Sequence, residues 1–326
     1  MKRKFVFFLP STWAFFKEEC RTDGYSLKNR LHGYIYSRWI YSYIAIGTGE
    51  HFVARKFKPL AGFLYQIFKP SKTSSHLGKC ISFADTYHGK VLSFDGAKQL
   101  VTLNQKIEIK DLEQVIPFNL ARSIVLENPD HIVLMDCPCR KSRAKPCKPI
   151  DVCLVIGEPF SQFALEHHPN RCRKISQQEA VEVLEAEHKR GHVHHAFFKS
   201  DLFDRFYAIC NCCSCCCGAI QAWKNGTPML ASSGYISRVD LDKCVSCGIC
   251  VAFCQFGALK KQGKEIIFDE SRCLGCGVCV TKCKENARWL ERDPSRGEPL
   301  DINRLVNRQQ RNDLDGTRKT GRDLCK

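Results

Sequence analysis

Short apolar runs recur through the middle of the chain, at residues 90–94, 131–135, 152–156 and 206–209. They are rich in β-branched and aromatic residues and too short for helices, so we expect them to form buried strands. Two of these runs lead directly into cysteines, one into Cys137 and the other into Cys210. The pattern therefore predicts rigid strands whose ends bring clusters of cysteines together.

Helical signals separate these runs and fall on residues 95–100, 117–126, 177–189 and 218–224. The clearest helix lies between Ser176 and Gly191. Ser176 and Glu179 form a capping box at its start, and Gly191 is a typical C-terminal stop. Alternating strands and helices followed by a small repeat unit predict the α+β fold class.

Charge and composition divide the 326 residues into four parts, 1–79, 80–234, 235–290 and 291–326. The first carries 14 Lys and Arg against four acidic residues and many aromatics, which predicts docking on a membrane surface or a partner complex. A buried helix of an ordinary domain is the alternative for its apolar stretch at 31–47. An α/β cysteine-rich domain and the repeat unit follow, and the polar tail is expected to be disordered.

The 22 cysteines are gathered in tight clusters rather than spread over loops. This distribution favours metal binding in a reducing compartment such as the cytoplasm over a disulfide framework. No run of 18 uncharged apolar residues occurs, so we expect no membrane-spanning helix, although association with a membrane surface stays open. The basic N-terminus lacks a cleavage site and is not expected to act as a signal peptide.

The strongest chemical signal is a repeat of four cysteines with the spacing C-x2-C-x2-C-x3-C. Three thiolates at this spacing surround one [4Fe–4S] cluster, while the fourth reaches the neighbouring cluster. One cluster is therefore expected on Cys244, Cys247, Cys250 and Cys283. The other is expected on Cys273, Cys276, Cys279 and Cys254. Zinc does not account for four cysteines that recur identically.

Residues 235–290 resemble the two-cluster ferredoxin domains of bacteria, and this resemblance implies two [4Fe–4S] clusters and electron transfer. Two features depart from the family's pattern. Gln255 and Lys284 follow the fourth cysteines, where the family usually has proline, and nine Lys and Arg outnumber six Asp and Glu. These departures favour a built-in electron conduit with its own docking surface over a freely diffusing acidic carrier.

A second set of ten cysteines precedes the repeat: Cys137, Cys139, Cys147, Cys153, Cys210, Cys212, Cys213, Cys215, Cys216 and Cys217. Over residues 85–290 the chain resembles cysteine-rich modules found upstream of ferredoxin domains in iron–sulfur proteins of anaerobic microbes. We expect at least one further iron–sulfur cluster here, with structural zinc and redox-active thiols as alternatives. Because adjacent cysteines point in different directions, they are not expected all to bind one metal.

Cations lie between the first four of these cysteines, at Arg140, Lys141, Arg143, Lys145 and Lys148. They either favour the ligated thiolates electrostatically or form a solvated loop face. Histidine replaces cysteine in some clusters, but packed or exposed side chains are expected at His192, His194 and His195. Free thiols are expected at the isolated Cys20, Cys80, Cys172 and Cys325.

Together these features favour a multi-cluster iron–sulfur protein that passes single electrons between a donor and an acceptor enzyme. It would act as a carrier or as an oxidoreductase subunit in a complex, rather than as a stand-alone enzyme. The alternative is an Fe–S or dithiol oxidoreductase whose catalytic site is the cysteine-rich module, fed by the ferredoxin-like repeat. The formal charge of +16 also suggests nucleic acid, but no recognition motif accompanies it, so specific nucleic-acid binding is not expected.

Overall fold

A seven-stranded sheet with the strand order β6-β4-β5-β8-β7-β1-β9 forms the centre of the computed structural model. The structure describes residues 9–20, 26–56, 87–109, 112, 115 and 123–308. Neighbouring strands of the sheet are antiparallel except for β1 and β9, which are parallel. The strands are β1 (Tyr87–Leu92), β4 (Ile132–Asp136), β5 (Asp151–Ile156), β6 (Cys172–Ile175), β7 (Val193–Lys199), β8 (Arg205–Cys212) and β9 (Leu230–Ala231).

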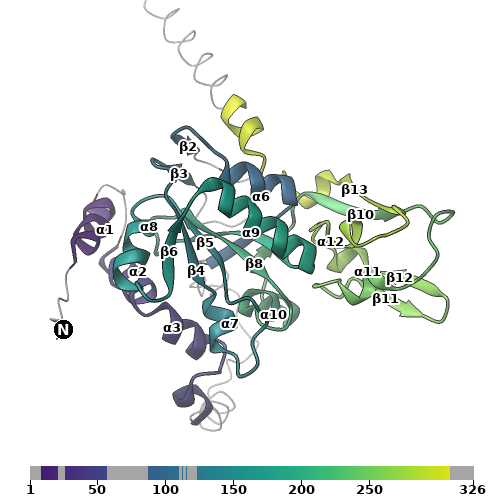
Figure 1. Ribbon diagram of the computed structural model, residues 1–326, viewed down its shortest axis with the longest axis horizontal. Helices are drawn as coiled ribbons and strands as arrows, with labels where there is room; N and C mark the ends of the chain where they lie inside the picture. The colour runs from purple at the N-terminus through teal and green to yellow at the C-terminus, as the bar shows by residue number, and fades with distance from the viewer. Residues whose placement is uncertain are drawn as a thin grey trace, which may run out of the picture.

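Helices cover both faces of this sheet (Figure 1). One face packs against α6 (Phe94–Val101) and α9 (Gln177–Arg190). The other packs against α1 (Pro10–Cys20), α2 (Leu27–Arg38), α3 (Ile40–Gly47), α8 (Phe160–His167) and α10 (Gly218–Lys224). Because strand side chains alternate, Leu134 lies in the first of these cores and Met135 in the second.

The predicted strands at 90–94, 131–135, 152–156 and 206–209 correspond to β1, β4, β5 and β8. The predicted caps of α9 are also present. The Ser176 side chain accepts a hydrogen bond from the Glu179 backbone N–H, and Gly191 has a left-handed φ of 85°. These local predictions are confirmed because their signals lie within a few residues of the structure they specify.

The N-terminal helices belong to the core of the sheet domain. Phe15, Tyr36 and Ile40 are buried beside Phe160 and Phe163 of α8. The apolar stretch at 31–47 forms parts of two helices, α2 and α3, rather than one. No helix in the described part of the chain is long and apolar enough to cross a membrane. These contacts favour the alternative interpretation of that stretch, in which it packs as ordinary core.

Two sequence predictions are wrong. The sequence predicts that residues 124–126 end a helix, but they form β3 (Ile124–Leu126), which pairs with β2 (Ile107–Ile109) because its apolar side chains are buried there. Residues 117–122 of that expected helix lie outside the described residues, and Ser123 forms an isolated bridge to Arg205. Disorder is expected from residue 291 onward, yet Leu300 and Ile302 are buried in the core that α6 lines. Residues 309–326 also lie outside the described part.

The repeat unit, residues 235–290, lies to one side of the sheet domain (Figure 1). Its strands pair as β10 (Tyr235–Val239) with β13 (Arg288–Arg292) and as β11 (Leu259–Gln262) with β12 (Glu265–Phe268). After β13 the chain returns to the sheet domain, where Lys90 Nζ donates a 2.7 Å hydrogen bond to the carbonyl of Glu298. The repeat unit is therefore inserted into the fold of the larger domain.

Gly191, the C-cap of α9, contacts this repeat unit directly. A Cβ atom at this position would overlap the ring of Phe253. We expect Gly191→Ala to lower the free energy of unfolding by about 2–4 kcal/mol, since it adds this overlap to the cost of a left-handed φ. Gly226→Ala is the matched control: Gly226 has a φ of +90°, and a Cβ atom added there would have no neighbouring atom within 4 Å. We expect it to cost only about 1 kcal/mol. Chemical denaturation measures both values, and an equal loss of unfolding free energy in the two variants would show that the contact between Gly191 and Phe253 is not tight.

Candidate metal centres

Two cavities in the repeat unit are each lined by four cysteines. One is lined by Cys244, Cys247, Cys250 and Cys283. The other, which we call the inner cavity, is lined by Cys254, Cys273, Cys276 and Cys279. Each group takes three cysteines from one copy of the repeat and the fourth from the other copy, as the crossed pattern expects. No three of these eight sulfur atoms, all in the described part, lie within 4.8 Å of one another. Each group thus surrounds a space wider than a single ion needs, which fits a cluster.

The two copies build these groups with the same local geometry. Gly248 and Gly277 have left-handed φ values of 84° and 79° and begin the single-turn helices α11 (Ile249–Ala252) and α12 (Val278–Thr281). The fourth cysteine of each copy accepts a backbone hydrogen bond, from Ala258 N to Cys254 Sγ at 3.2 Å and from Ala287 N to Cys283 Sγ at 3.3 Å. Such N–H donors stabilise a ligating thiolate.

The inner cavity faces the sheet domain, whereas the cavity lined by Cys244, Cys247, Cys250 and Cys283, which we call the outer cavity, faces away from it. Phe256, Leu274 and Val278 line the inner cavity and also belong to the core on the α8 face of the sheet. Burial raises the pKa of Cys276 well above its ordinary value and that of Cys279 to about 11. Cys247 of the outer cavity is exposed. Without a bound cation the thiols of Cys276 and Cys279 would be neutral, so a metal must displace their protons when it binds.

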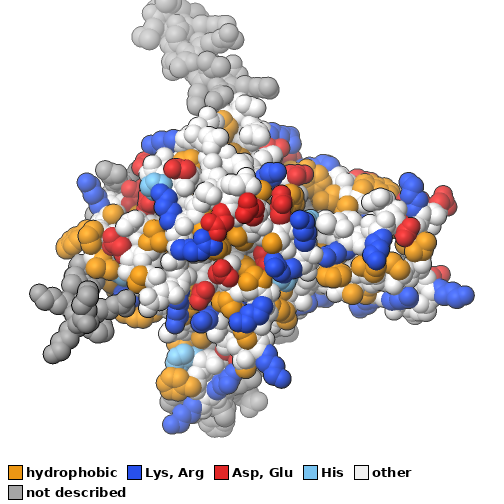
Figure 2. All heavy atoms as spheres, in the orientation of Figure 1, with side chains coloured by type: hydrophobic (Ala, Val, Ile, Leu, Met, Phe, Trp, Pro, Cys, Tyr) orange, Lys and Arg blue, Asp and Glu red, His pale blue; other side chains and the backbone are white. Residues whose placement is uncertain are grey.

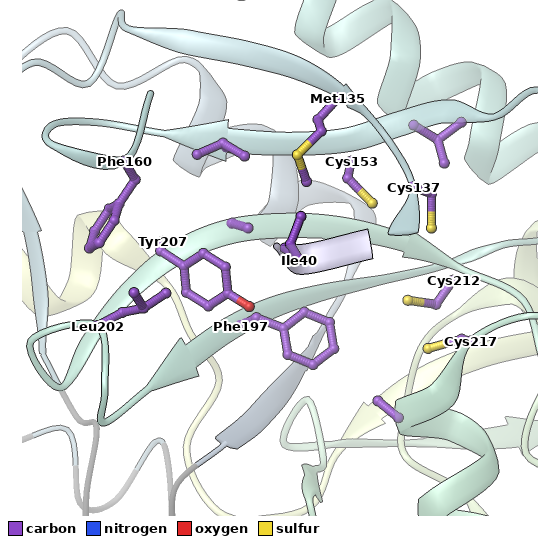
Figure 3. Close-up of a cluster of buried hydrophobic side chains, with 14 of the residues drawn as sticks. Ile40, Met135, Cys137, Cys153, Phe160, Phe197, Leu202, Tyr207, Cys212 and Cys217 are labelled. Carbon is purple, nitrogen blue, oxygen red and sulfur yellow. The ribbon is translucent and has the colours of Figure 1, made fainter. Parts of the chain in front are cut away.

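Six of the ten upstream cysteines form a second group at the end of the sheet, which we call the six-cysteine group. Its members are Cys137, Cys139, Cys153, Cys210, Cys212 and Cys217. Their thiols approach one another in pairs (Cys137 with Cys139 and Cys153, Cys153 with Cys210, Cys139 with Cys217, and Cys217 with Cys212), but no three of these sulfur atoms, all in described residues, lie within 4.8 Å of one another. Figure 3 shows Cys137, Cys153, Cys212 and Cys217 gathered on one side of the core. The strand ends therefore converge, as the sequence predicts.

A row of side chains across three strands forms the floor of this group. Cys153 of β5 lies opposite Cys210 of β8, which lies opposite His195 of β7. Directly opposed residues of antiparallel strands share a face, so His195 lies on the face of the two cysteines. Its ring is fully buried and approaches the backbone of Val193, but neither ring nitrogen makes a hydrogen bond of normal geometry to a described residue. A buried imidazole without such a hydrogen bond fits a site that binds a metal or cofactor, to which the ring could donate.

The remaining four upstream cysteines form a separate group, which we call the four-cysteine group. It consists of Cys147, Cys213, Cys215 and Cys216, whose sulfur atoms all lie within 4.8 Å of one another. The adjacent pairs Cys212/Cys213 and Cys216/Cys217 are thus divided between two groups, as expected for neighbours that point apart. Cys215 and Cys216 stay together because they lie in a tight turn, in which Cys216 N donates to the carbonyl of Cys213. The ten cysteines therefore make two groups and not one.

Arg140 connects the elements that carry these groups. Its side chain is 1% exposed and donates to Glu187 Oε2 at 2.7 Å and to the carbonyl of Asn211 at 3.0 Å. A third bond reaches the carbonyl of Pro149 at 2.5 Å. Burial opposes ionisation of Glu187, but hydrogen bonds and charges from His192 and Arg140 outweigh it and hold the pKa of this carboxyl below its ordinary value. Arg140 therefore links the 137–149 loop to β8 through buried hydrogen bonds, and its charge is paired with that of Glu187.

The other predicted cations have different surroundings. Arg143 donates to the carbonyl of Cys216 at 3.0 Å and to Glu50 at 2.7 Å, so it also holds the loop in place. Lys141, Lys145 and Lys148 are exposed. The expectation of a solvated loop face therefore holds for the three lysines and not for the two arginines.

Hydrogen bonds connect the sheet domain to the repeat unit at several places that the sequence did not indicate, and two of these connections are made by Gln255 and His188. Gln255, which follows Cys254, donates to the carbonyl of Gly191 and accepts from the backbone N–H of Ser214, both at 2.8 Å. Ser214 lies between two members of the four-cysteine group. The departure from proline at position 255 thus has a structural reason, because proline has no side-chain amide to make these bonds.

The second connection is a chain of histidines. His194 bonds to Asn211 Oδ1 at 2.6 Å and to His188 at 3.3 Å, and His188 bonds to Thr281 of the repeat unit at 2.6 Å. Burial lowers the pKa of His194 to about 4, so its ring is neutral near pH 7. His192 bonds to Glu187. These contacts agree with the expectation that His192 and His194 are packed side chains.

The isolated cysteines stay apart from all four groups where the structure describes them. Cys172 lies on β6 and is half-buried. Cys80 and Cys325 lie outside the described residues, as does the side chain of Cys20. Cys172 is therefore the natural control for substitutions at grouped cysteines.

Comparison with known families finds one match. The model of the 4Fe-4S dicluster domain family matches residues 243–287, which contain all eight cysteines around the two cavities. Comparisons with curated proteins and with solved structures give no significant match. The matched region is a ferredoxin-type region that binds iron and sulfur, and it covers a small part of the chain.

Proposed function

We propose that this protein passes single electrons from an external donor through two [4Fe–4S] clusters of the repeat unit to a third iron–sulfur centre at the six-cysteine group. The observation that carries the proposal is the shared core. Leu274 and Val278 of the inner cavity pack in the same cluster of buried side chains as Cys212 and Cys217. The sheet domain and the repeat unit thus share one apolar core, which suits electron transfer between a centre in each.

The residues of the chain would bind the clusters, bury them and hold them at fixed positions relative to one another. Bound clusters would supply reversible one-electron chemistry. The crossed cysteines would hold the two clusters of the repeat unit, and the six-cysteine group has more thiols than one four-iron cluster needs. Phe256, which also lines the inner cavity, is buried, and its ring centre lies 6.3 Å from that of His195 in the sheet domain. Gln255 and the chain of histidines would fix the distance between them.

The outer cavity is the proposed point of electron entry. Cys247 is exposed there, and Leu241 and Val245 beside it are 80% and 65% exposed. Figure 2 shows hydrophobic side chains on the repeat unit with basic side chains around them. An exposed apolar centre with a basic side chain such as Lys261, which lies against Gly248 of this cavity, suits a redox partner whose surface is acidic.

We also propose that the N-terminal helices contact a membrane surface or a larger complex. Leu27, Leu31 and Ile35 are spaced four residues apart on α2 and are all exposed. Residues with this spacing lie on one side of a helix. Lys28 and Arg30 add positive charge to the same segment, which would favour an anionic surface.

A count of electrons tests the proposed function. The full-length protein, purified anaerobically, is titrated with a low-potential reductant while iron, acid-labile sulfide and EPR signals are measured. Three one-electron centres predict an uptake of about three electrons per chain. An uptake of two electrons with about eight iron atoms per chain would show that the conduit is confined to the repeat unit.

His195→Leu should change the third centre selectively. A hydrogen bond from a buried imidazole to a cluster raises its reduction potential, so we expect the variant to lower the midpoint potential of one EPR signal. Leucine is tolerated beside Phe197 and Phe256, which surround this ring. The signals of the repeat unit serve as the internal control and should keep their potentials. If all signals keep their wild-type potentials, His195 does not face a redox centre.

A second candidate function is an oxidoreductase with its catalytic site at the six-cysteine group. One observation favours it: the core that contains these cysteines also contains a small apolar cavity, lined by Met135, Val155, Tyr36 and Tyr207. The hydroxyls of the two tyrosines bond to each other at 2.8 Å. Substrate-dependent reoxidation of the reduced protein would distinguish this function from electron transfer alone.

A further inference from the structure

We propose that the four-cysteine group binds one Zn²⁺ ion and is a structural site, separate from the iron–sulfur centres. This inference goes beyond the electron-transfer function. It assigns Cys147, Cys213, Cys215 and Cys216 as the four ligands. Its evidence is the spacing of the sulfur atoms, the shape of the two segments that carry them, and the contrast with the cluster cavities of the same molecule.

The spacing of the sulfur atoms fits a single tetrahedral ion. A Zn–S bond of about 2.3 Å places the sulfurs of a tetrahedral site about 3.8 Å apart. Cys215 Sγ lies 3.8 Å from Cys216 Sγ, the distance expected at such a site, and no pair in the group is more than 4.8 Å apart. Cys215 Sγ and Cys147 Sγ are 2.9 Å apart, so these two sulfurs would have to separate by about 0.9 Å when the ion binds. In the described part of the chain this is the only set of three or more potential ligands so closely gathered.

The cysteines of the repeat unit give the contrast. They surround cavities, and no three of them approach one another to this extent within the described residues. A four-iron cluster binds each thiolate through a different iron, so its ligands stand farther apart than those of one ion. The same fold thus contains two classes of cysteine group, of which only the tight one matches a mononuclear site.

The two segments that supply the ligands are already held together by polar contacts. Cys147 N donates to Cys216 Sγ at 3.4 Å, which is a bond that stabilises a thiolate ligand. Arg143 donates to the carbonyl of Cys216 through Nε and through a terminal nitrogen, at 3.2 and 3.0 Å. The basic side chains of Lys145 and Lys148 flank Cys147 along the loop, where they would offset the net negative charge of a zinc tetrathiolate.

A structural role follows from the position of the group. Four protein thiolates leave no open coordination position, which is typical of structural zinc. Cys212 and Cys217, the residues that enclose the turn 213–216, both belong to the six-cysteine group. A zinc ion bound to this turn would therefore hold Cys212 and Cys217, two ligands of the proposed third centre, in place. It would not itself carry electrons, because Zn²⁺ has no redox chemistry.

The test is metal analysis of the full-length protein, purified anaerobically. We expect about one zinc per chain in addition to iron, and X-ray absorption at the zinc edge should show four sulfur ligands at about 2.3 Å. Cys215→Ser and Cys147→Ser should each lose the zinc, while the EPR signals of the repeat unit report that the chain is still folded. Cys172→Ser is the matched control and should keep the zinc.

Three outcomes would overturn the proposal. The zinc could have nitrogen or oxygen ligands or persist in Cys215→Ser, so that it lies elsewhere. The variant could lose iron and sulfide instead, so that these cysteines hold a cluster. Mass spectrometry could find a Cys147–Cys215 disulfide and no zinc. Because zinc carries neither sulfide nor an EPR signal, its absence would leave the count of three electrons as an independent test of the proposed function.

Discussion

Replacing Cys254 with serine is expected to remove about four iron atoms per chain and to abolish the cluster of the other repeat copy. The reason is the crossed grouping, in which Cys254 lines the cavity of Cys273, Cys276 and Cys279. Cys254→Ser should therefore lose the same EPR signal as Cys276→Ser. Cys283→Ser should in turn lose the same signal as Cys247→Ser.

Direct ligation within each copy makes the opposite prediction. Cys254→Ser would then match Cys247→Ser, and Cys283→Ser would match Cys276→Ser. The four spectra thus distinguish the two patterns without any assumption about which signal belongs to which cluster. Cys172→Ser, at a cysteine outside every group, should keep the wild-type iron content and spectrum.

Replacing Arg140 with methionine is expected to lower the free energy of unfolding by about 3–5 kcal/mol at pH 7. The change removes the buried cation beside Glu187, which is 1% exposed and keeps only Arg190 and His192 as partners, and it removes donors from the carbonyls of Pro149 and Asn211. The 137–149 loop would also lose its tie to β8, so the metal content of the sheet domain should fall together with the stability. Chemical denaturation and iron analysis measure the two effects.

Two further variants separate the charge effect from a general loss of packing. Removing both charges, in Arg140→Met with Glu187→Leu, should recover part of the lost stability because no unpaired buried charge is left. Arg173→Met disrupts an exposed pair with Glu179 and should be nearly neutral. The pKa of Glu187 is lowered in the fold, so the Arg140 contribution is present above the ordinary carboxyl pKa and declines as the pH falls through the lower folded value. A loss in Arg140→Met that does not change with pH would contradict this account.

Local signals predicted much of this molecule. The caps of α9 and the runs that became β1, β4, β5 and β8 lie within single elements, so short stretches of sequence are enough to indicate them. The grouping of the repeat cysteines could likewise be expected from spacing alone, because each triplet lies within one short loop and turn.

The division of the upstream cysteines could not be predicted in this way. It depends on the register that sets Cys153 opposite Cys210, and on a loop that carries Cys147 to the turn at 213–216. Both are contacts between segments more than 50 residues apart, which no local pattern specifies. The burial of Leu300 and Ile302 is similar, since two apolar residues in a polar stretch show their role only when the core they complete is known.

The most direct test of the central claim is the order in which the centres are reduced. The full-length protein is mixed with a reducing protein partner, frozen at successive times and examined by EPR. The account predicts that signals of the repeat unit appear first and that the signal sensitive to His195→Leu follows. In Cys254→Ser, which lacks the inner cluster, this later signal should appear at least about ten times more slowly. An equally fast appearance of that signal in Cys254→Ser would show that electrons reach the sheet domain without passing through the repeat unit.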